Sequence, residues 1–126
     1  MLKLFILTTT EPNRLFTKTV NSVVPDEFEV VGSVGEINGK VKEGWFLVLY
    51  DTEYLSFGLK KGIDSILKMD LDYDMLVFMK QNPNGKLYQS PRMFKHYVKL
   101  KENSFLPEDQ NLKTERILDG WIYEHA

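Results

Sequence analysis

An apolar stretch that runs directly into two carboxylates sets the strongest constraint on the fold of this chain. Residues 45–50, WFLVLY, are all apolar or aromatic, and Asp51, Thr52 and Glu53 follow without a break. A short continuous apolar run is typical of a strand buried on both faces of a sheet. We therefore expect a central strand at 45–50 that delivers Asp51 and Glu53 to one edge of the sheet.

The segments before this strand alternate between strand and helix patterns. Residues 2–7, LKLFIL, form another apolar run, and residues 28–34, FEVVGSV, are rich in β-branched side chains. Between them, apolar positions recur at helical spacing over 15–23, and Pro25 ends the pattern. Strand, helix and strand in this order predict a parallel βαβ unit with a right-handed crossover.

The segments after the strand continue the alternation. Ser56 is placed to cap a helix with apolar positions over 59–67, and residues 75–79, MLVFM, indicate another buried strand. Apolar and polar residues alternate over 93–101, which is typical of a strand exposed on one face near a sheet edge. Pro107 and two acids then precede a helical spacing of apolar residues, which predicts a last helix toward the C-terminus.

This order of elements predicts an α/β fold. We expect a three-layer sandwich with a mostly parallel sheet, followed by an antiparallel edge strand and a C-terminal helix. The length fits a single domain of residues 1–126. In sheets of this kind, ligands bind beyond the carboxyl ends of the strands. We therefore expect the loops at 8–13, 33–36 and 51–53 to share one ligand-binding edge.

The amino-acid composition limits the kinds of binding partner and site that the chain is expected to have. The net charge is −2, so no overall attraction draws the chain to nucleic acid, and nucleic-acid binding is not favoured. The chain has no Cys, which rules out disulfides, thiolate metal sites and a Cys nucleophile. No apolar run approaches the length of a membrane span, and the lack of disulfides favours a cytoplasmic protein.

The acid-x-acid pair of Asp51 and Glu53 is the sharpest chemical signal. Two carboxylates at one strand end present hard oxygen ligands, which Mg²⁺ or Mn²⁺ accepts together with phosphate oxygens and water. A cation held there would neutralise a diphosphate. The alternative is structural, because acids are common where strands emerge into solvent, and Asp51 could cap the following helix.

Two segments carry a resemblance to a known family. ILTTTEPNRLFTKTVNSV, for the first strand, loop and helix, and FLVLYDTEYLS, for the acidic strand end, resemble the nucleotide-diphospho-sugar glycosyltransferases of the A fold. The resemblance covers roughly the first 80 residues. It implies that the acid-x-acid pair binds a metal and the sugar diphosphate. It also implies that the loop after the first strand lies against a nucleotide base, where the matching places are held by Thr9, Thr10, Asn13 and Arg14.

The chain is shorter than members of that family, and Ser33 and Gly35 stand where they carry an acid after the second strand. The sequence therefore predicts a reduced glycosyltransferase-like protein that binds a nucleotide-sugar through a divalent cation. Sugar transfer is left open, and no catalytic residue is assigned. The alternative is a non-catalytic α/β module that binds a protein partner, for which Trp121 and Tyr123 are candidate contacts.

Two further groups of charged residues have structural explanations that we favour. Asp70, Asp72 and Asp74 suggest a metal site, but a solvated connection into the next strand explains them better. Arg92 and the basic and aromatic residues of 93–101 could contact phosphates or stacked bases. Lysines on an edge strand also prevent aggregation, so we place neither group in the predicted ligand site.

Overall fold

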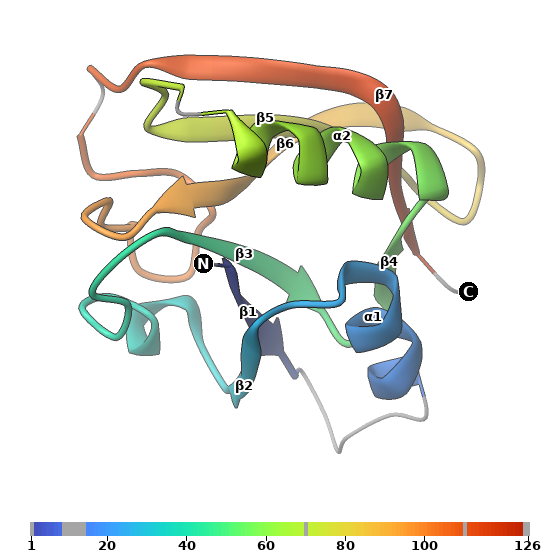
Figure 1. Cartoon of the computed structure of the whole chain (residues 1–126). Helices are drawn as coiled ribbons and strands as arrows, with labels where there is room; N and C mark the ends of the chain where they lie inside the picture. The colour runs from blue at the N-terminus through green and yellow to red at the C-terminus, as the bar shows by residue number, and fades with distance from the viewer. Residues whose placement is uncertain (1, 9–14, 70, 110, 125–126) are drawn as a thin grey trace.

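The computed structural model describes residues 2–8, 15–69, 71–109 and 111–124 (Figure 1). The strands of this part of the chain are β1 (Leu2–Leu7), β2 (Glu27–Val31), β3 (Trp45–Tyr50), β4 (Glu53–Leu55), β5 (Met75–Gln81), β6 (Leu87–Lys95) and β7 (Thr114–Glu124). Its helices are α1 (Leu15–Val23), α2 (Phe57–Lys68) and the short 3₁₀ helix η1 (Val34–Glu36). Neither α-helix combines the length and the apolar character that crossing a membrane requires.

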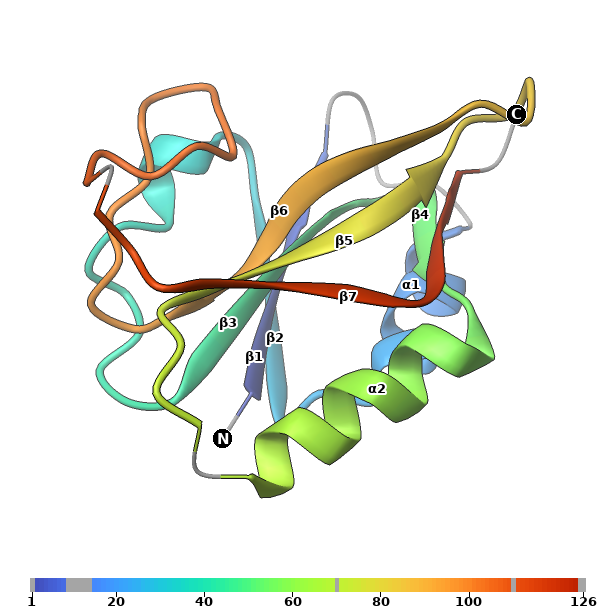
Figure 2. The ribbon, with the colours of Figure 1, turned by 90° about the horizontal axis from the view of Figure 1, so that it is seen from above.

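The seven strands form one mixed sheet that curls into a half-barrel (Figure 2). The strand order is β2-β1-β3-β6-β5-β7-β4. β1 pairs in parallel with both β2 and β3, which confirms the predicted parallel pairing at the start of the chain. β6 runs antiparallel between β3 and β5. β7 pairs in parallel with β5, and β4 pairs antiparallel with the end of β7.

The predicted three-layer sandwich with a mostly parallel sheet is wrong, because the second half of the chain adds strands to the sheet instead of a second helical layer. Both α-helices lie against one face, since Val23 of α1 and Leu59 of α2 belong to the same buried cluster. The opposite face is covered by η1 and by residues from the segment 96–113. Without a second helical layer, the right-handed twist of the strands accumulates into the curl of the sheet.

The predicted edge strand at 93–101 is also wrong. β6 spans Leu87–Lys95 and lies in the centre of the sheet. The chain leaves it through a turn, in which Val98 N donates to Lys95 O at 3.0 Å. Val98 and Leu100 are then buried from a loop, and this burial produces their strand-like alternation. A loop that covers a core can thus imitate the period of a strand.

A β-bulge explains how a central strand accommodates Pro91. The pairing of β5 with β6 shifts between Leu76, opposite Met93, and Val77, opposite Pro91, so that Arg92 is the extra residue. Proline lacks the N–H that a central strand needs, and a bulge is one of the few places in a sheet that tolerates it. A bulge also re-aims side chains, and here Arg92 turns into the protein interior.

The predicted C-terminal helix is wrong as well, since β7 occupies Thr114–Glu124. Gly120 has a φ of +88°, and the strand bends sharply near its end (Figure 2). β7 pairs with β5 and, after the bend, also with β4. The buried residues Ile117 and Ile122 lie on either side of the bend, so their spacing does not need a helix.

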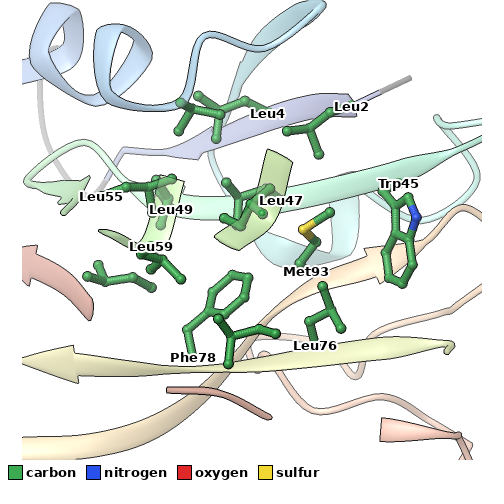
Figure 3. Packing of buried hydrophobic residues seen from close by; sticks show 14 of the residues in the cluster. Leu2, Leu4, Trp45, Leu47, Leu49, Leu55, Leu59, Leu76, Phe78 and Met93 are labelled. Atoms are coloured by element: carbon green, nitrogen blue, oxygen red, sulfur yellow. The ribbon is translucent and has the colours of Figure 1, made fainter. Parts of the chain in front are cut away.

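Two buried clusters lie on the two faces of the sheet. The helix-side cluster includes Leu4 and Leu47 (Figure 3). The second cluster includes Phe5, Phe46 and Phe94, and the ring centroids of Phe46 and Phe94 lie 5.3 Å apart. Because neighbouring residues of β1 and β3 alternate between the clusters, these strands are buried on both faces, as their apolar runs predicted.

Candidate functional site

The carboxyl ends of β2, β1 and β3 lie side by side at one edge of the sheet. A hollow of about 180 Å³ lies at this edge, lined by residues at the three strand ends and by one residue of the segment 96–113. Its polar side chains belong to Thr8, Ser33, Tyr50 and Asn103. The edge at which the sequence predicts a ligand therefore carries a hollow with hydrogen-bonding groups.

A second hollow of about 300 Å³ adjoins the first through Tyr50, which lines both. Its other lining residues are Asp51, Thr52 and Glu124. Tyr50 packs edge-on against Phe105, with ring centroids 5.5 Å apart. These two hollows at the strand ends, with Tyr50 as their shared wall, are together called the crevice, and one of the two predicted metal ligands, Asp51, lines the second.

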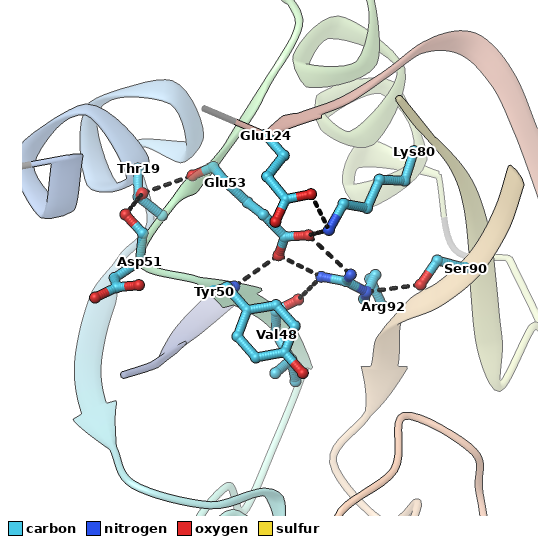
Figure 4. Close-up of polar contacts among 9 residues, drawn as sticks. All are labelled: Thr19, Val48, Tyr50, Asp51, Glu53, Lys80, Ser90, Arg92 and Glu124. Carbon is cyan, nitrogen blue, oxygen red and sulfur yellow. Dashed lines mark hydrogen bonds and ion pairs between the residues drawn. The ribbon is translucent and has the colours of Figure 1, made fainter. Parts of the chain in front are cut away.

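Helix α1 fixes the turn that joins β3 to β4. The Thr19 hydroxyl donates to Glu53 O at 2.6 Å and lies 3.3 Å from Asp51 O. Ser22 Oγ accepts a hydrogen bond from Leu55 N at 3.0 Å. These hydroxyls satisfy backbone groups that an edge strand would otherwise leave open. The turn therefore has a defined shape, from which the carboxylates of Asp51 and Glu53 point away from each other (Figure 4).

Glu53 is fully buried, and its carboxylate binds two cations (Figure 4). Arg92 donates to both carboxylate oxygens, from Nη1 at 2.6 Å and from Nη2 at 2.9 Å. Lys80 forms a second ion pair with Glu53, and Tyr50 N donates to it at 2.7 Å. A bidentate pair of arginine and carboxylate is strong and geometrically specific. Glu53 is thus engaged in an ion-pair network inside the protein.

This ion-pair network joins the five strands from β3 to β7. Arg92 of β6 also donates to Val48 O of β3 at 3.3 Å. Lys80 of β5 pairs with Glu124 of β7 at 3.3 Å, and Glu53 is the first residue of β4. The ion-pair network therefore links strands that are distant in sequence, and it stabilises the curled part of the sheet.

The charges in the ion-pair network determine the protonation states of Glu53 and Lys80. Burial raises the pKa of Glu53, but the charge of Arg92 and its hydrogen bonds, followed by those of Lys80, outweigh burial and hold this pKa below its usual range. Burial by itself would lower the pKa of Lys80, and the Glu53 charge instead raises that pKa above its ordinary value. Both groups are therefore charged at neutral pH.

The lowered pKa of Glu53 predicts a specific sensitivity to acid. A carboxyl group with a depressed folded-state pKa contributes stability above its unfolded pKa and loses it as pH falls through the folded pKa. We expect the free energy of unfolding to decrease below the ordinary Glu pKa of 4.5, and to decrease less in Glu53→Gln. Urea unfolding at a series of pH values measures both slopes. Equal slopes would contradict a charged Glu53 in the folded protein.

Asp51 differs from Glu53, because its carboxylate has no hydrogen-bond or ion-pair partner in the described part of the chain and lines the second hollow. One carboxylate suffices for Mg²⁺ when phosphate oxygens and water complete the coordination shell. Asp51 therefore fits a divalent cation, whereas Glu53 would first have to leave Arg92 and Lys80. No three His, Cys, Asp or Glu side chains of the described residues are grouped to hold a metal ion.

The structure does not describe the four predicted nucleotide-binding residues, which are Thr9, Thr10, Asn13 and Arg14. Thr8, directly before them, is described. Its backbone N–H donates to Val31 O at 3.2 Å, which holds the end of β1 against β2. Thr8, the last described residue before that segment, lines the hollow of about 180 Å³.

Sequence reasoning did not find Lys80, Glu124 or Asn103, and it related Arg92 to a phosphate. A signal for the ion-pair network was present, because Lys80 and Arg92 interrupt apolar patterns in β5 and β6. A cation at a buried strand position needs a carboxylate partner. The identity of that partner depends on the strand order, which the sequence does not provide.

The second acidic group has structural partners. Asp74 accepts hydrogen bonds from the Tyr97 hydroxyl and from Lys113 N, the latter at 2.9 Å. Asp72 pairs with the Lys113 ammonium at 2.7 Å. Burial, followed by the hydrogen bond to Asp74, raises the pKa of Tyr97 to about 12. These contacts support a solvated connection at this position, and Asp70 lies outside the described residues.

No model of a known protein family matches this chain, and no curated protein matches it either. The likeness to glycosyltransferases of the A fold therefore remains a resemblance in the residues themselves. Function is inferred from the crevice at the carboxyl edge of the sheet and from the charges around it.

Proposed function

We propose that the chain binds a nucleotide-sugar at the carboxyl edge of β2, β1 and β3, through a divalent cation held by Asp51. The observation that carries this proposal is the environment of Asp51. Its carboxylate has no partner among the described residues, and it lines a hollow beside the ends of three parallel strands. Ligands of α/β sheets bind at such strand ends.

The two adjoining hollows suit the two parts of such a ligand. The first offers Thr8, Ser33 and Asn103 as hydrogen-bonding partners for a base or ribose. The second is lined by the carboxylate of Asp51, which would repel a diphosphate unless a divalent cation lay between them. Binding of the phosphates should therefore depend on the metal.

Glu53 has an indirect part in this proposal. The acid-x-acid pattern predicts that both carboxylates are metal ligands. In the structure, however, Glu53 accepts hydrogen bonds from Arg92 and from the backbone of Tyr50. In this role it fixes the strand end that carries Asp51 instead of contacting the cation. We keep Asp51 as the proposed ligand, with Mn²⁺ or Mg²⁺ as the cation.

Asp51→Asn tests the proposal with little change in side-chain shape. We expect it to weaken the metal-dependent binding of nucleoside diphosphates about tenfold or more, because the amide lacks the charge that attracts the cation. Amide NMR spectra of the isotope-labelled protein, recorded with a panel of nucleoside diphosphates and nucleotide-sugars, measure this affinity with and without metal. Mn²⁺ is paramagnetic, so signal loss centred on residues 50–53 would locate the ion.

Glu43→Gln is the matched control, because Glu43 is exposed and precedes β3 at the opposite end of that strand. It removes the same charge, and we expect it to bind like the wild-type chain. Equal losses in the two variants would mean that only net charge matters at this edge. If no ligand of the panel changed the amide NMR spectrum, with or without metal, the proposal would be overturned. Release of nucleoside diphosphate from a bound sugar donor measures turnover in the same samples.

A further inference from the structure

Two Asn-Gly dipeptides occur in this chain, Asn38-Gly39 and Asn84-Gly85. In such a dipeptide the backbone nitrogen of the Gly can attack the side-chain amide carbon of the Asn, because Gly has no side chain that hinders a close approach. The attack requires a main chain that can rearrange and an amide that is free to turn toward this nitrogen. The surroundings of the two dipeptides therefore determine which of them reacts in the folded protein.

The side-chain amide of Asn38 is held at both ends. Its Nδ2 donates to Leu100 O at 3.0 Å, and its Oδ1 accepts a hydrogen bond from Leu100 N at 2.9 Å. Leu100 is fully buried in the second cluster. Turning the amide toward the nitrogen of Gly39 would break both hydrogen bonds and leave the backbone groups of a buried residue without partners.

Asn84 lies in the turn that joins β5 to β6, at the tip of their hairpin (Figure 2). Asn84 and Gly85 are both exposed. Asn84 Oδ1 accepts one hydrogen bond, from Lys86 N at 3.1 Å, and its Nδ2 has no partner in the described part of the chain. Apart from Gly85 and its chain neighbours, no described atom lies within 4 Å of a Cβ built on Gly85. The tip can therefore rearrange without displacing other parts of the protein.

One backbone hydrogen bond must open before the reaction, because Gly85 N donates to Asn82 O at 2.9 Å. This bond closes the turn at the hairpin tip. Hydrogen bonds of exposed turns open at low free-energy cost, without unfolding of the core. Asn84 therefore reaches the reactive arrangement from the folded protein, whereas Asn38 must first separate from Leu100.

We propose that Asn84 is a site of spontaneous deamidation in the folded protein, with the Gly85 nitrogen as the nucleophile, and that Asn38 is protected. The Gly85 nitrogen forms a bond to Asn84 Cγ, the bond from Cγ to Nδ2 breaks, and the proton lost by the Gly85 nitrogen leaves with Nδ2 as ammonia. Water then adds to either carbonyl carbon of the resulting succinimide. Opening of the ring yields aspartate or isoaspartate at position 84, and no oxidant or reductant is consumed.

The deamidated chain is expected to stay folded. Residues 83–89 are all exposed, so the new carboxylate enters water and not the core. Isoaspartate adds its Cβ to the main chain, but it does so in a turn that carries no buried side chain. Modified molecules should therefore accumulate as folded protein with one additional negative charge.

Incubation of the full chain in warm, mildly alkaline buffer, followed by peptide mapping with mass spectrometry, tests this proposal. We expect deamidation at Asn84 to be about tenfold or more faster than at Asn38, because Asn38 would have to give up two hydrogen bonds to a buried residue. Incubation in heavy-oxygen water labels each newly formed carboxylate, which separates the reaction from earlier damage. Ion-exchange chromatography isolates the modified chains, and circular dichroism establishes that they are folded.

Unfolding in guanidinium chloride is the matched control, because it removes the hydrogen bonds around both dipeptides. The rates at Asn84 and Asn38 should then become similar, since each Asn is followed by Gly. In the folded protein, Gly85→Ala should slow the reaction at Asn84, because the methyl group hinders the attacking nitrogen, and it should leave the rate at Asn38 unchanged.

Equal rates at the two sites in the folded protein, or a faster reaction at Asn38, would overturn the proposal. The proposal would also be overturned if Asn84 stayed intact in the folded chain and reacted only in guanidinium chloride, because the hairpin turn would then protect it. A fast reaction at Asn84 and a slow one at Asn38, with similar rates after unfolding, supports it.

Discussion

Glu53→Gln is expected to lower the free energy of unfolding by about 3–5 kcal/mol, the usual loss when a buried charge is left without its partner. Glutamine has nearly the shape of glutamate, so the packing is preserved and the loss reports the charge. The neutral amide leaves Arg92 and Lys80 buried without the carboxylate that both bind. Because domains of this size are stable by only about 5–15 kcal/mol, this variant should lose a large part of its stability.

Lys80→Met gives an internal comparison. It removes one cation, but Glu53 keeps both hydrogen bonds from Arg92 and the one from Tyr50 N. Glu124, which loses its partner, keeps contact with solvent. We therefore expect a smaller loss than in Glu53→Gln, because no buried charge is left unpaired.

Urea unfolding at neutral pH, followed by circular dichroism, measures these differences. Asp72→Asn is the surface control, because Asp72 and Lys113 form an ion pair at 2.7 Å whose side chains are mostly exposed. Solvent screens such a pair, so little stability depends on it. If Glu53→Gln unfolds at the same urea concentration as the wild-type chain, the ion-pair network does not hold the sheet. Glu53 would then be available as the metal ligand that the acid-x-acid pattern predicts.

The elements that the sequence predicts correctly are those determined by local chemistry. The apolar runs locate β1 and β3, and Ser56 caps α2 as expected, with its Oγ accepting from Leu59 N at 3.2 Å. The edge with the crevice was predictable for the same reason. The end of a strand is a local property, and parallel neighbours end at the same edge.

The spacing of Asp51 and Glu53 did not predict that their carboxylates point away from each other. Two residues apart in a continuous strand would lie on the same face, but Asp51 and Thr52 form a turn instead. The hydroxyl of Thr19, from α1, stabilises that turn. The main partner of Glu53, Arg92, lies 39 residues further along the chain, and the bulge next to Pro91 turns it inward. Both effects depend on contacts between distant segments, which a short motif does not contain.

The C-terminal strand was missed because its apolar spacing fits two structures. Ile117, Trp121 and Ile122 could line one side of a helix, and they also fit a strand that bends at Gly120. In a helix, Gly120 would be only an unfavourable residue. In β7, its positive φ is the conformation that the bend requires, so this one residue separates the two interpretations.

Gly120→Ala is expected to destabilise the protein by about 3–4 kcal/mol. A side chain is strained at a φ of +88°, and an added Cβ would lie 2.6 Å from Leu59 N and closer still to Ser56 Oγ. Neither atom can move freely, because Ser56 Oγ accepts hydrogen bonds from Leu59 N at 3.2 Å and from Trp121 N at 3.0 Å. The methyl group would therefore push β7 away from the N-terminus of α2.

The variant Gly85→Ala measures the cost of backbone strain alone, without the steric clash expected in Gly120→Ala. Gly85 has nearly the same φ, +86°, but among the described residues no atom other than those of Gly85 and its chain neighbours lies within 4 Å of an added Cβ. Strain alone should cost about 1–2 kcal/mol, measured by urea unfolding under identical conditions. A larger loss in Gly120→Ala would show that the contact between α2 and the bend of β7 supports the fold. Equal losses would mean that the helix cap yields to the methyl group, and that pairing with β4 and β5 is enough to hold the bend.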